Sequence, residues 1–165
     1  MLNIILRNRL MTAAFIVFAI GSVSIISALV FEHVLGFQPC ELCYLQRKPW
    51  YFIISFTLLL LLLGSKGNDR LVRWGLLLAG AVLVGEAALA FWHAGIEWKW
   101  WPGPSSCTGA VNMTGALPDL SKRVVLCDEA AVRILGLSFA GWNAVVSLIT
   151  AIIAFWGAAG RTDGE

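Results

Sequence analysis

Long apolar runs alternate with short polar segments along the chain. Four runs of about twenty residues each stand out: Leu10 to Phe31, Leu45 to Leu63, Trp74 to Trp92 and Gly136 to Trp156. A bilayer core of about 30 Å is crossed by about 20 helical residues. The pattern therefore predicts an all-α integral membrane protein, in which four transmembrane helices form one bundle and residues 1–165 form a single domain.

The first apolar run follows a short basic segment, so a cleaved signal peptide is the competing interpretation. However, about 22 apolar residues exceed the usual signal-peptide core of about 7–15, and no clear small-residue cleavage site precedes Glu32. We therefore expect this run to remain as the first span.

The composition supports a membrane protein and argues against a nucleic-acid partner. Hydrophobic residues make up 59% of the chain and charged residues only 13%, about half the share in a typical soluble domain. The net charge is +2, and no basic cluster is interleaved with aromatic residues as in nucleic-acid-binding surfaces.

Four spans would place residues 32–44 and 93–135 as loops on one side of the membrane, and both termini on the other. Within the longer loop, Asp128 to Ile134 could form a short helix. Six Lys and Arg residues fall on each side, but those on the terminal side are concentrated in shorter segments. Basic residues near span ends favour the cytoplasm.

All four cysteines fall on the side opposite the termini. Disulfides persist in a periplasm rather than in a cytosol. If the protein lies in a bacterial inner membrane, both observations agree on cytoplasmic termini and periplasmic loops.

The Cys-x-x-Cys pair of Cys40 and Cys43 is the first candidate for chemistry, because it precedes the second span. A thiolate is favoured at a helix N-terminus and beside a cation, so we expect the start of the second span and Arg47 to lower the pKa of Cys43. Arg47 lies four residues after Cys43, so a continuous helix would place both on one face. A structural disulfide or half of a zinc site are the alternatives, and we favour a redox pair.

Pro49 leaves the start of the second span open. Proline fits the first turn of a helix but kinks a helix interior. The helix therefore begins either near Lys48, or near Cys43 with a bend at Pro49.

Cys107 and Cys127 lie twenty residues apart in the long loop. They could form a loop-closing disulfide worth about 3 kcal/mol. Alternatively, they form a second redox pair that exchanges with a soluble partner and with the first pair. A zinc site built from all four sulfurs is disfavoured, because the second pair lacks the tight spacing of zinc ligands. No metal is predicted.

Three further ionisable residues in or near the spans are candidates for a role in the chemistry: His33, His93 and Glu86. His33 and His93 are at the outer ends. His33 reads as an interfacial hydrogen-bonding residue, whereas His93 could also donate to, or relay protons for, an acceptor beside Cys43. Glu86 lies within the third span, where a carboxylate is costly. It could form a hydrogen bond in its protonated form, for example with Asn143 or a serine of the first span, or it could transfer protons.

Three motifs together resemble the disulfide bond formation protein B (DsbB) family. They are Pro39-Cys-x-x-Cys-Tyr-Leu-Gln-Arg47 followed by Pro49, then His93-Ala-Gly-Ile-Glu-Trp-Lys-Trp-Trp-Pro-Gly-Pro-Ser-Ser-Cys107, and Leu137-Ser-Phe-Ala-Gly-Trp-Asn143. The resemblance extends over nearly the whole chain.

The resemblance implies an inner-membrane enzyme that reoxidises a periplasmic DsbA-like oxidase of the thioredoxin fold and passes the electrons to ubiquinone or menaquinone. It implies that Cys107 forms the mixed disulfide with the partner and that Cys127 is its exchanging mate. It also implies that Cys43 is the thiolate facing the quinone and that Cys40 is its disulfide partner.

The same resemblance implies a quinone-binding role for Arg47 and His93, and it does not assign Glu86 a role. Two other functions fit the same cysteines. One is a vitamin K epoxide reductase-like enzyme, although such proteins usually carry the quinone-side pair in a later span. The other is a non-enzymatic membrane scaffold with structural disulfides.

Overall fold

A computed structural model describes residues 2–104 and 127–159, with side chains from residue 9 onward. It contains four long helices and one short hairpin: α1 (Leu2–His33), α2 (Glu41–Ser65), α3 (Asp69–Glu97), β1 (Arg133–Ile134), β2 (Leu137–Ser138) and α4 (Phe139–Ala158). All four helices are long and apolar enough to cross a membrane. The predicted all-α membrane fold is confirmed.

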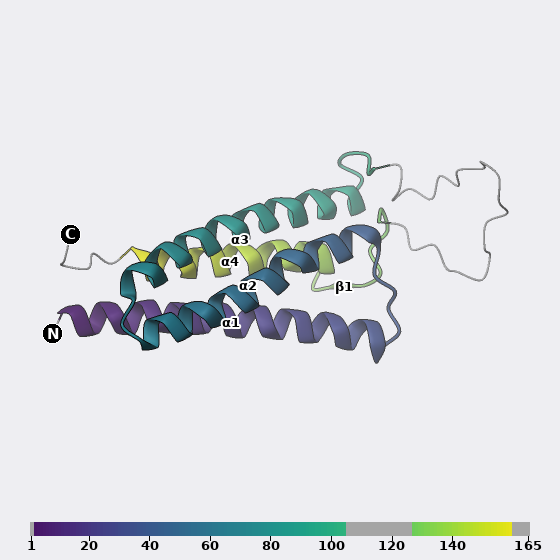
Figure 1. Cartoon of the computed structure of the whole chain (residues 1–165). Coiled ribbons are helices and arrows are strands. Elements are labelled where there is room, and N and C mark those ends of the chain that lie inside the picture. Colours follow the sequence, from purple (N-terminus) through teal and green to yellow (C-terminus); the bar gives the residue numbers. More distant parts are fainter. Residues whose placement is uncertain (1, 105–126, 160–165) are drawn as a thin grey trace, which may run out of the picture.

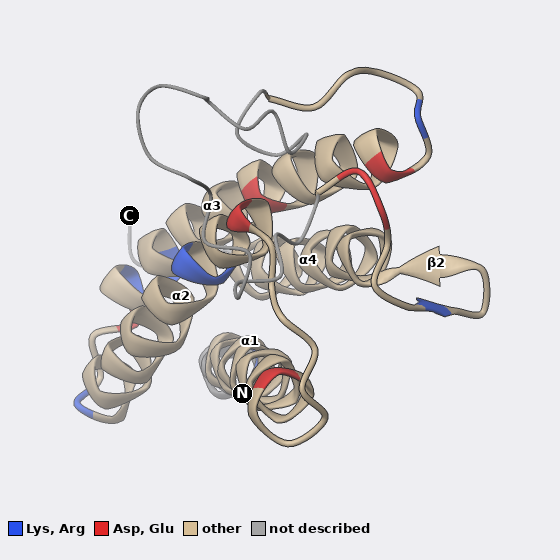
Figure 2. Ribbon diagram, turned by 90° about the vertical axis from the view of Figure 1, so that its right-hand side faces the viewer, with Lys and Arg blue, Asp and Glu red and all other residues tan. Residues whose placement is uncertain are grey.

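The helices run up and down in one bundle (Figure 1). The packing is most extensive between α3 and α4, followed by α1 with α2 and α2 with α3. The start of α1 and the end of α4 lie at one end of the bundle together with the α2–α3 turn. The segment between α1 and α2 and the hairpin lie at the other end, which we call the loop end. Most of the helical ribbon carries no charged residue (Figure 2).

The helices extend past several of the predicted spans. The second begins at Glu41 rather than at residue 45, because Cys40 caps its N-terminus, and the third continues to Glu97 rather than ending at residue 92. Pro49 lies inside α2, so the alternative of a start near Lys48 is wrong, and Cys43 and Arg47 share one helix.

Two expectations for the segment before α4 are wrong. Residues 128–134 form a turn and strand β1 instead of a helix. The fourth helix begins at Phe139 rather than at residue 136, because the Ser138 side chain accepts from the Gly141 N–H. Leu135 and Gly136 both have positive φ, at 52° and 86°, as the two central residues of a type I′ hairpin turn require.

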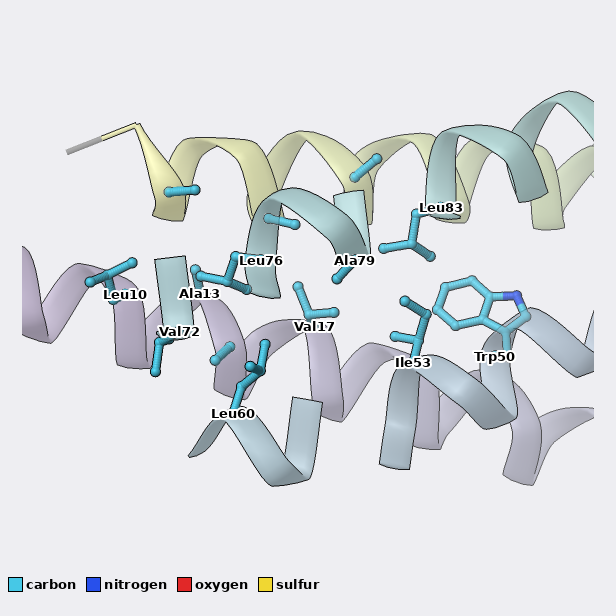
Figure 3. Packing of buried hydrophobic residues seen from close by; sticks show 14 of the residues in the cluster. Leu10, Ala13, Val17, Trp50, Ile53, Leu60, Val72, Leu76, Ala79 and Leu83 are labelled. Carbon is cyan, nitrogen blue, oxygen red and sulfur yellow. The ribbon is translucent and has the colours of Figure 1, made fainter. Parts of the chain in front are cut away.

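The interior is a row of small and branched apolar side chains (Figure 3). Val17, Ile53 and Leu76 are completely buried within it. Close helix packing depends on two glycines of α3: a Cβ at Gly75 would collide with the Leu60 side chain, and one at Gly80 with the Phe155 ring. Such small residues allow membrane helices to approach closely.

Candidate functional site

Cys40 and Cys43 lie where α2 begins, at the loop end of the bundle. Cys40 is the N-cap residue, and its Sγ accepts a hydrogen bond from the Cys43 backbone N–H at 3.2 Å. The two Sγ atoms are 2.6 Å apart, and both cysteines are free. A small movement would therefore suffice to join them in a disulfide.

The surroundings of Cys40 favour its thiolate. Its side-chain hydrogen bond with Cys43 lowers its pKa most, and the contact with His93 and the Cys43 backbone N–H lower it further. Burial opposes these effects, and the net result is a pKa of about 5 rather than the ordinary 9.0. The sequence predicted a stabilised thiolate at Cys43, whereas the groups that favour a thiolate in the structure surround Cys40.

His93 lies on α3 directly behind the cysteine pair. Its side chain is buried, and its Nε2 is 3.7 Å from the Cys40 Sγ. Its Nδ1 is 2.8 Å from the amide nitrogen of Gln46, one turn into α2. Glu97, four residues further along α3, has a carboxylate oxygen 3.9 Å from Nε2. His93 thus contacts Cys40 and Gln46.

Cys127 lies beside the first pair although it is far away in sequence. It is buried in a small apolar cluster with Cys40, Leu42 and Ile96, which we call the sulfur cluster. Cys127 is disulfide-bonded, unlike Cys40 and Cys43. Cys107 lies outside the described residues. The structure therefore brings one cysteine of the predicted second pair next to the first pair.

A cavity of about 610 Å³ lies between α1, α2 and α4 at the loop end. Its wall is mostly apolar, with side chains such as Ile20, Val23 and Phe139. Cys43 and Arg47 also line it. A mainly apolar cavity with a few polar groups at one end is typical of small-molecule sites. In the described part of the chain, neither Cys40 nor His93 is among the residues that line this cavity.

Arg47 forms an ion pair with Glu32 at the mouth of this cavity. The Glu32 carboxylate also accepts from the Tyr44 hydroxyl at 2.8 Å, and Arg47 donates to the Ala28 carbonyl at 3.5 Å. The guanidinium is therefore held in place from α1. This role of Glu32 was not predicted from the sequence, since only folding brings the end of α1 opposite α2.

A second group of polar side chains is buried between α2, α3 and α4. Asn143 donates to Gln46 at 2.9 Å and to Glu86 at 2.6 Å, and it accepts from Trp50 at 2.9 Å. The predicted hydrogen bond between Glu86 and Asn143 is confirmed. The roles of Gln46 and Trp50 were not predicted from the sequence. The only signal was the position of Gln46, a polar residue inside a span and one turn after Cys43.

Cys40, Cys43 and His93 also have the donor types of a metal site. Their ligand atoms all lie within 4.8 Å of one another. Structural zinc takes four ligands, and among the described residues the Glu97 carboxylate, 3.9 Å from the His93 Nε2, is one further donor. Whether His93 can act as a ligand depends on which of its nitrogens carries the proton.

These features define a class of protein. The site combines a dithiol at the start of a span, a disulfide-bonded cysteine packed beside it, and an adjoining apolar cavity. This combination is typical of a thiol–disulfide protein embedded in a membrane. The family model described as "Disulfide bond formation protein DsbB" matches residues 9–157, and the chain belongs to this family. It is therefore a multi-pass membrane protein of disulfide bond formation, which confirms the family resemblance.

Several curated relatives are similar over most of their length. "Disulfide bond formation protein B" of Marinobacter nauticus is 35% identical over 72% of this chain and 73% of the relative. The protein of that name from Saccharophagus degradans is 32% identical over 87% of this chain and 89% of the relative. "Uncharacterized protein RP370" of Rickettsia prowazekii is 20% identical over 89% and 87%. No solved structure matches the chain significantly.

Proposed function

We propose that this protein is a quinone-dependent thiol oxidoreductase of the bacterial inner membrane that reoxidises a periplasmic DsbA-like dithiol. Family membership and the cysteine geometry support this function. The loop end, which carries the described cysteines, would face the periplasm, where disulfides persist. The termini would then face the cytoplasm.

Electrons would pass through two cysteine pairs by thiol–disulfide exchange. The partner's dithiol would reduce the Cys107–Cys127 disulfide, and the partner would leave with a new disulfide. The loop dithiol would then reduce a Cys40–Cys43 disulfide. Finally, Cys40 and Cys43 would give two electrons and two protons to the quinone and form their disulfide again. Each exchange step needs a thiolate with access to a disulfide sulfur.

The observation that supports this proposal is that, of the first pair, Cys43 lines the cavity and Cys40 does not. Cys40 is a buried member of the sulfur cluster with Cys127, and Cys43 packs against this cluster. Cys43 lines the apolar cavity, together with Arg47. We therefore propose that Cys40 receives electrons from the loop pair and that Cys43 passes them to an acceptor in the cavity.

The cavity suits a quinone as acceptor. Its apolar wall would accommodate a prenylated ring, and the Arg47 guanidinium at its mouth would donate to a ring carbonyl and stabilise developing negative charge. Ubiquinone and menaquinone share these features, so the cavity supports both. His93 would act from behind the pair, through Cys40.

The test is quinone reduction by purified protein with a reduced DsbA-like partner as electron donor. We expect Cys43→Ser to abolish quinone reduction, because serine cannot form the disulfide. Tyr51→Phe, on an exposed face of the same helix, is the control and should retain turnover. Unchanged turnover in Cys43→Ser would exclude the proposed route.

Thiol labelling in cells separates this relay from a scaffold with structural disulfides. In cells that lack quinone, a relay accumulates free thiols because its final acceptor is missing. Structural disulfides would stay oxidised under the same conditions, and that result would contradict the proposal.

A further inference from the structure

A chain of hydrogen bonds connects Trp50 to Cys40 through three buried or half-buried side chains. It runs from Trp50 on α2 to Asn143 on α4, returns to Gln46 on α2, and reaches His93 on α3 and then Cys40. Figure 3 shows the Trp50 indole at one end of the apolar row, beside Ile53 and Leu83. Which group donates and which accepts in each of these hydrogen bonds follows from Trp50, the first residue of the chain.

The indole N–H of Trp50 can only donate a hydrogen bond. Its partner, 2.9 Å away, must therefore be the amide oxygen of Asn143. The Ser147 hydroxyl approaches the same oxygen at 3.5 Å. The amide nitrogen of Asn143 then points the other way, where its two hydrogens meet the oxygens of Gln46 and Glu86. All hydrogen-bonding capacity of the Asn143 side chain is used in this arrangement.

The orientation of Asn143 fixes that of Gln46. Because Asn143 donates to Gln46, the Gln46 atom at that contact is the amide oxygen. The Gln46 amide nitrogen therefore faces the His93 Nδ1, 2.8 Å away. An amide nitrogen only donates, so Nδ1 must accept with its lone pair. In neutral His93 the ring proton is then on Nε2, the nitrogen 3.7 Å from the Cys40 Sγ.

We propose that Trp50, Asn143 and Gln46 are positioning residues that hold neutral His93 in its Nε2–H tautomer, so that its N–H points at the sulfur of Cys40. None of the three contacts Cys40 in the described structure through its side chain; they act through His93. The N-cap hydrogen bond from the Cys43 backbone reaches the same sulfur. Two N–H groups from different helices thus converge on Cys40.

This arrangement selects the sulfur that carries the negative charge in the reduced pair. A hydrogen bond donated to the charged form of a group favours that form. The Cys40 sulfur receives such bonds, whereas Cys43 borders an apolar cavity. Among the described residues, Cys43 on α2 and His93 on α3 favour the Cys40 thiolate, whereas the charge of Glu97 on α3 opposes it. The effect of this charge on electron transfer rests on the proposed function, whereas the assignment of the His93 tautomer does not.

The same tautomer disfavours a metal ion bound by Cys40, Cys43 and His93. A metal-bound histidine donates from its second ring nitrogen to an acceptor. Here Nδ1 faces an amide N–H, and Nε2 carries the proton where the metal would bind. Metal binding would require the amides of Gln46 and Asn143 to turn over, against the fixed donor of Trp50.

Nitrogen-15 NMR of the histidine side chains tests the tautomer directly in reduced protein without quinone or partner. The chain has only two histidines, so a His33→Gln variant assigns the His93 signals. We expect a protonated Nε2 and an unprotonated Nδ1 for His93. A proton on Nδ1 would overturn the proposal, even if quinone reduction works as proposed.

The Trp50→Phe variant then tests how the tautomer is held. It removes the N–H that orients Asn143, so we expect mixed His93 tautomers and an upward shift of the Cys40 thiolate titration. Trp74→Phe, at an exposed position outside this chain of hydrogen bonds, should change neither. If Trp50→Phe retains the Nε2–H tautomer and the titration of the original protein, the proposed role of Trp50 is wrong. If Trp50→Phe does not fold, the tautomer measured in the original protein still decides the main proposal.

Discussion

Cys40 shows how much the function of a cysteine depends on residues far away in sequence. The Cys-x-x-Cys spacing predicts a redox pair, and the position at the start of a span predicts help from the helix N-terminus. Which of the two sulfurs receives that help depends on the first helical residue. Because α2 begins at Glu41, the N-cap position falls on Cys40. His93, 53 residues later, reaches the same sulfur.

The first prediction concerns the charge on Cys40. In reduced protein, the first thiol proton should be lost with a midpoint near pH 5, because the pKa of Cys40 is lowered from 9.0 to about 5. The thiolate stabilises the reduced fold; this contribution is full above about pH 9, decreases as the pH falls, and is lost as the pH falls through about 5. The ultraviolet absorbance of the thiolate follows the titration.

The His93→Phe variant is the matching test for the first prediction. It removes one donor to Cys40 and should raise the midpoint of the titration, whereas His33→Phe should leave it unchanged. A midpoint near 9.0 in the unaltered protein would contradict the lowered pKa of Cys40.

The second prediction concerns Glu32, which holds Arg47 at the cavity. Glu32→Ala should raise the KM for quinone by about tenfold, equivalent to ~1.4 kcal/mol, because the guanidinium loses its fixed position. The effect on kcat should be smaller. Glu41→Ala removes an exposed carboxylate at the same end of the bundle and serves as the control. Steady-state quinone reduction would measure KM and kcat for each variant. An equal KM in the two variants would contradict this role of Glu32.

At the scale of the helices, the apolar pattern predicted four spans but misplaced several ends. Hydropathy shows only the apolar part of a helix, whereas the helix itself continues at both ends into polar residues. Capping decides the ends: Cys40 caps α2 and Ser138 caps α4. Pro49 was ambiguous for a related reason, since a local sequence does not reveal whether tertiary packing will extend a helix through a proline.

The third prediction tests the cap of α4. Ser138→Ala should lower the free energy of unfolding in detergent by about 1 kcal/mol, because the Gly141 N–H loses its acceptor at a buried position. Ser65→Ala, which removes an exposed hydroxyl at the end of α2, should change it much less. Equal stability of the two variants would show that this cap contributes little.

At the scale of the whole molecule, the cavity could not be predicted from the sequence. Its wall comes from α1, α2 and α4 and from the segment between α1 and α2, so it depends on how the helices pack. The same holds for the buried amide chain, which brings Asn143 within reach of Gln46 almost a hundred residues earlier. The distances between these residues depend on how the helices pack, which the sequence pattern does not reveal.

The fourth prediction tests the cavity as the acceptor site. Ala19→Phe on α1 introduces a ring into the cavity wall and should strongly reduce quinone turnover. Exchange between the cysteine pairs and the partner should continue in a single turnover, because the sulfur cluster is untouched. Ile26→Phe, on an exposed face of α1, should retain turnover. Loss of turnover in both variants would indicate a general effect of the added ring on α1.

The burial of Cys127 beside Cys40 has a kinetic consequence. Two groups held on one chain react as if at a high effective concentration, set by the geometry of the chain rather than by the amount of protein. Exchange between the two cysteine pairs should therefore be first order and independent of how densely the protein populates the membrane. Only the meetings with the soluble partner and with the acceptor would depend on concentration, so the cell would control the flow of electrons at the two ends of the route.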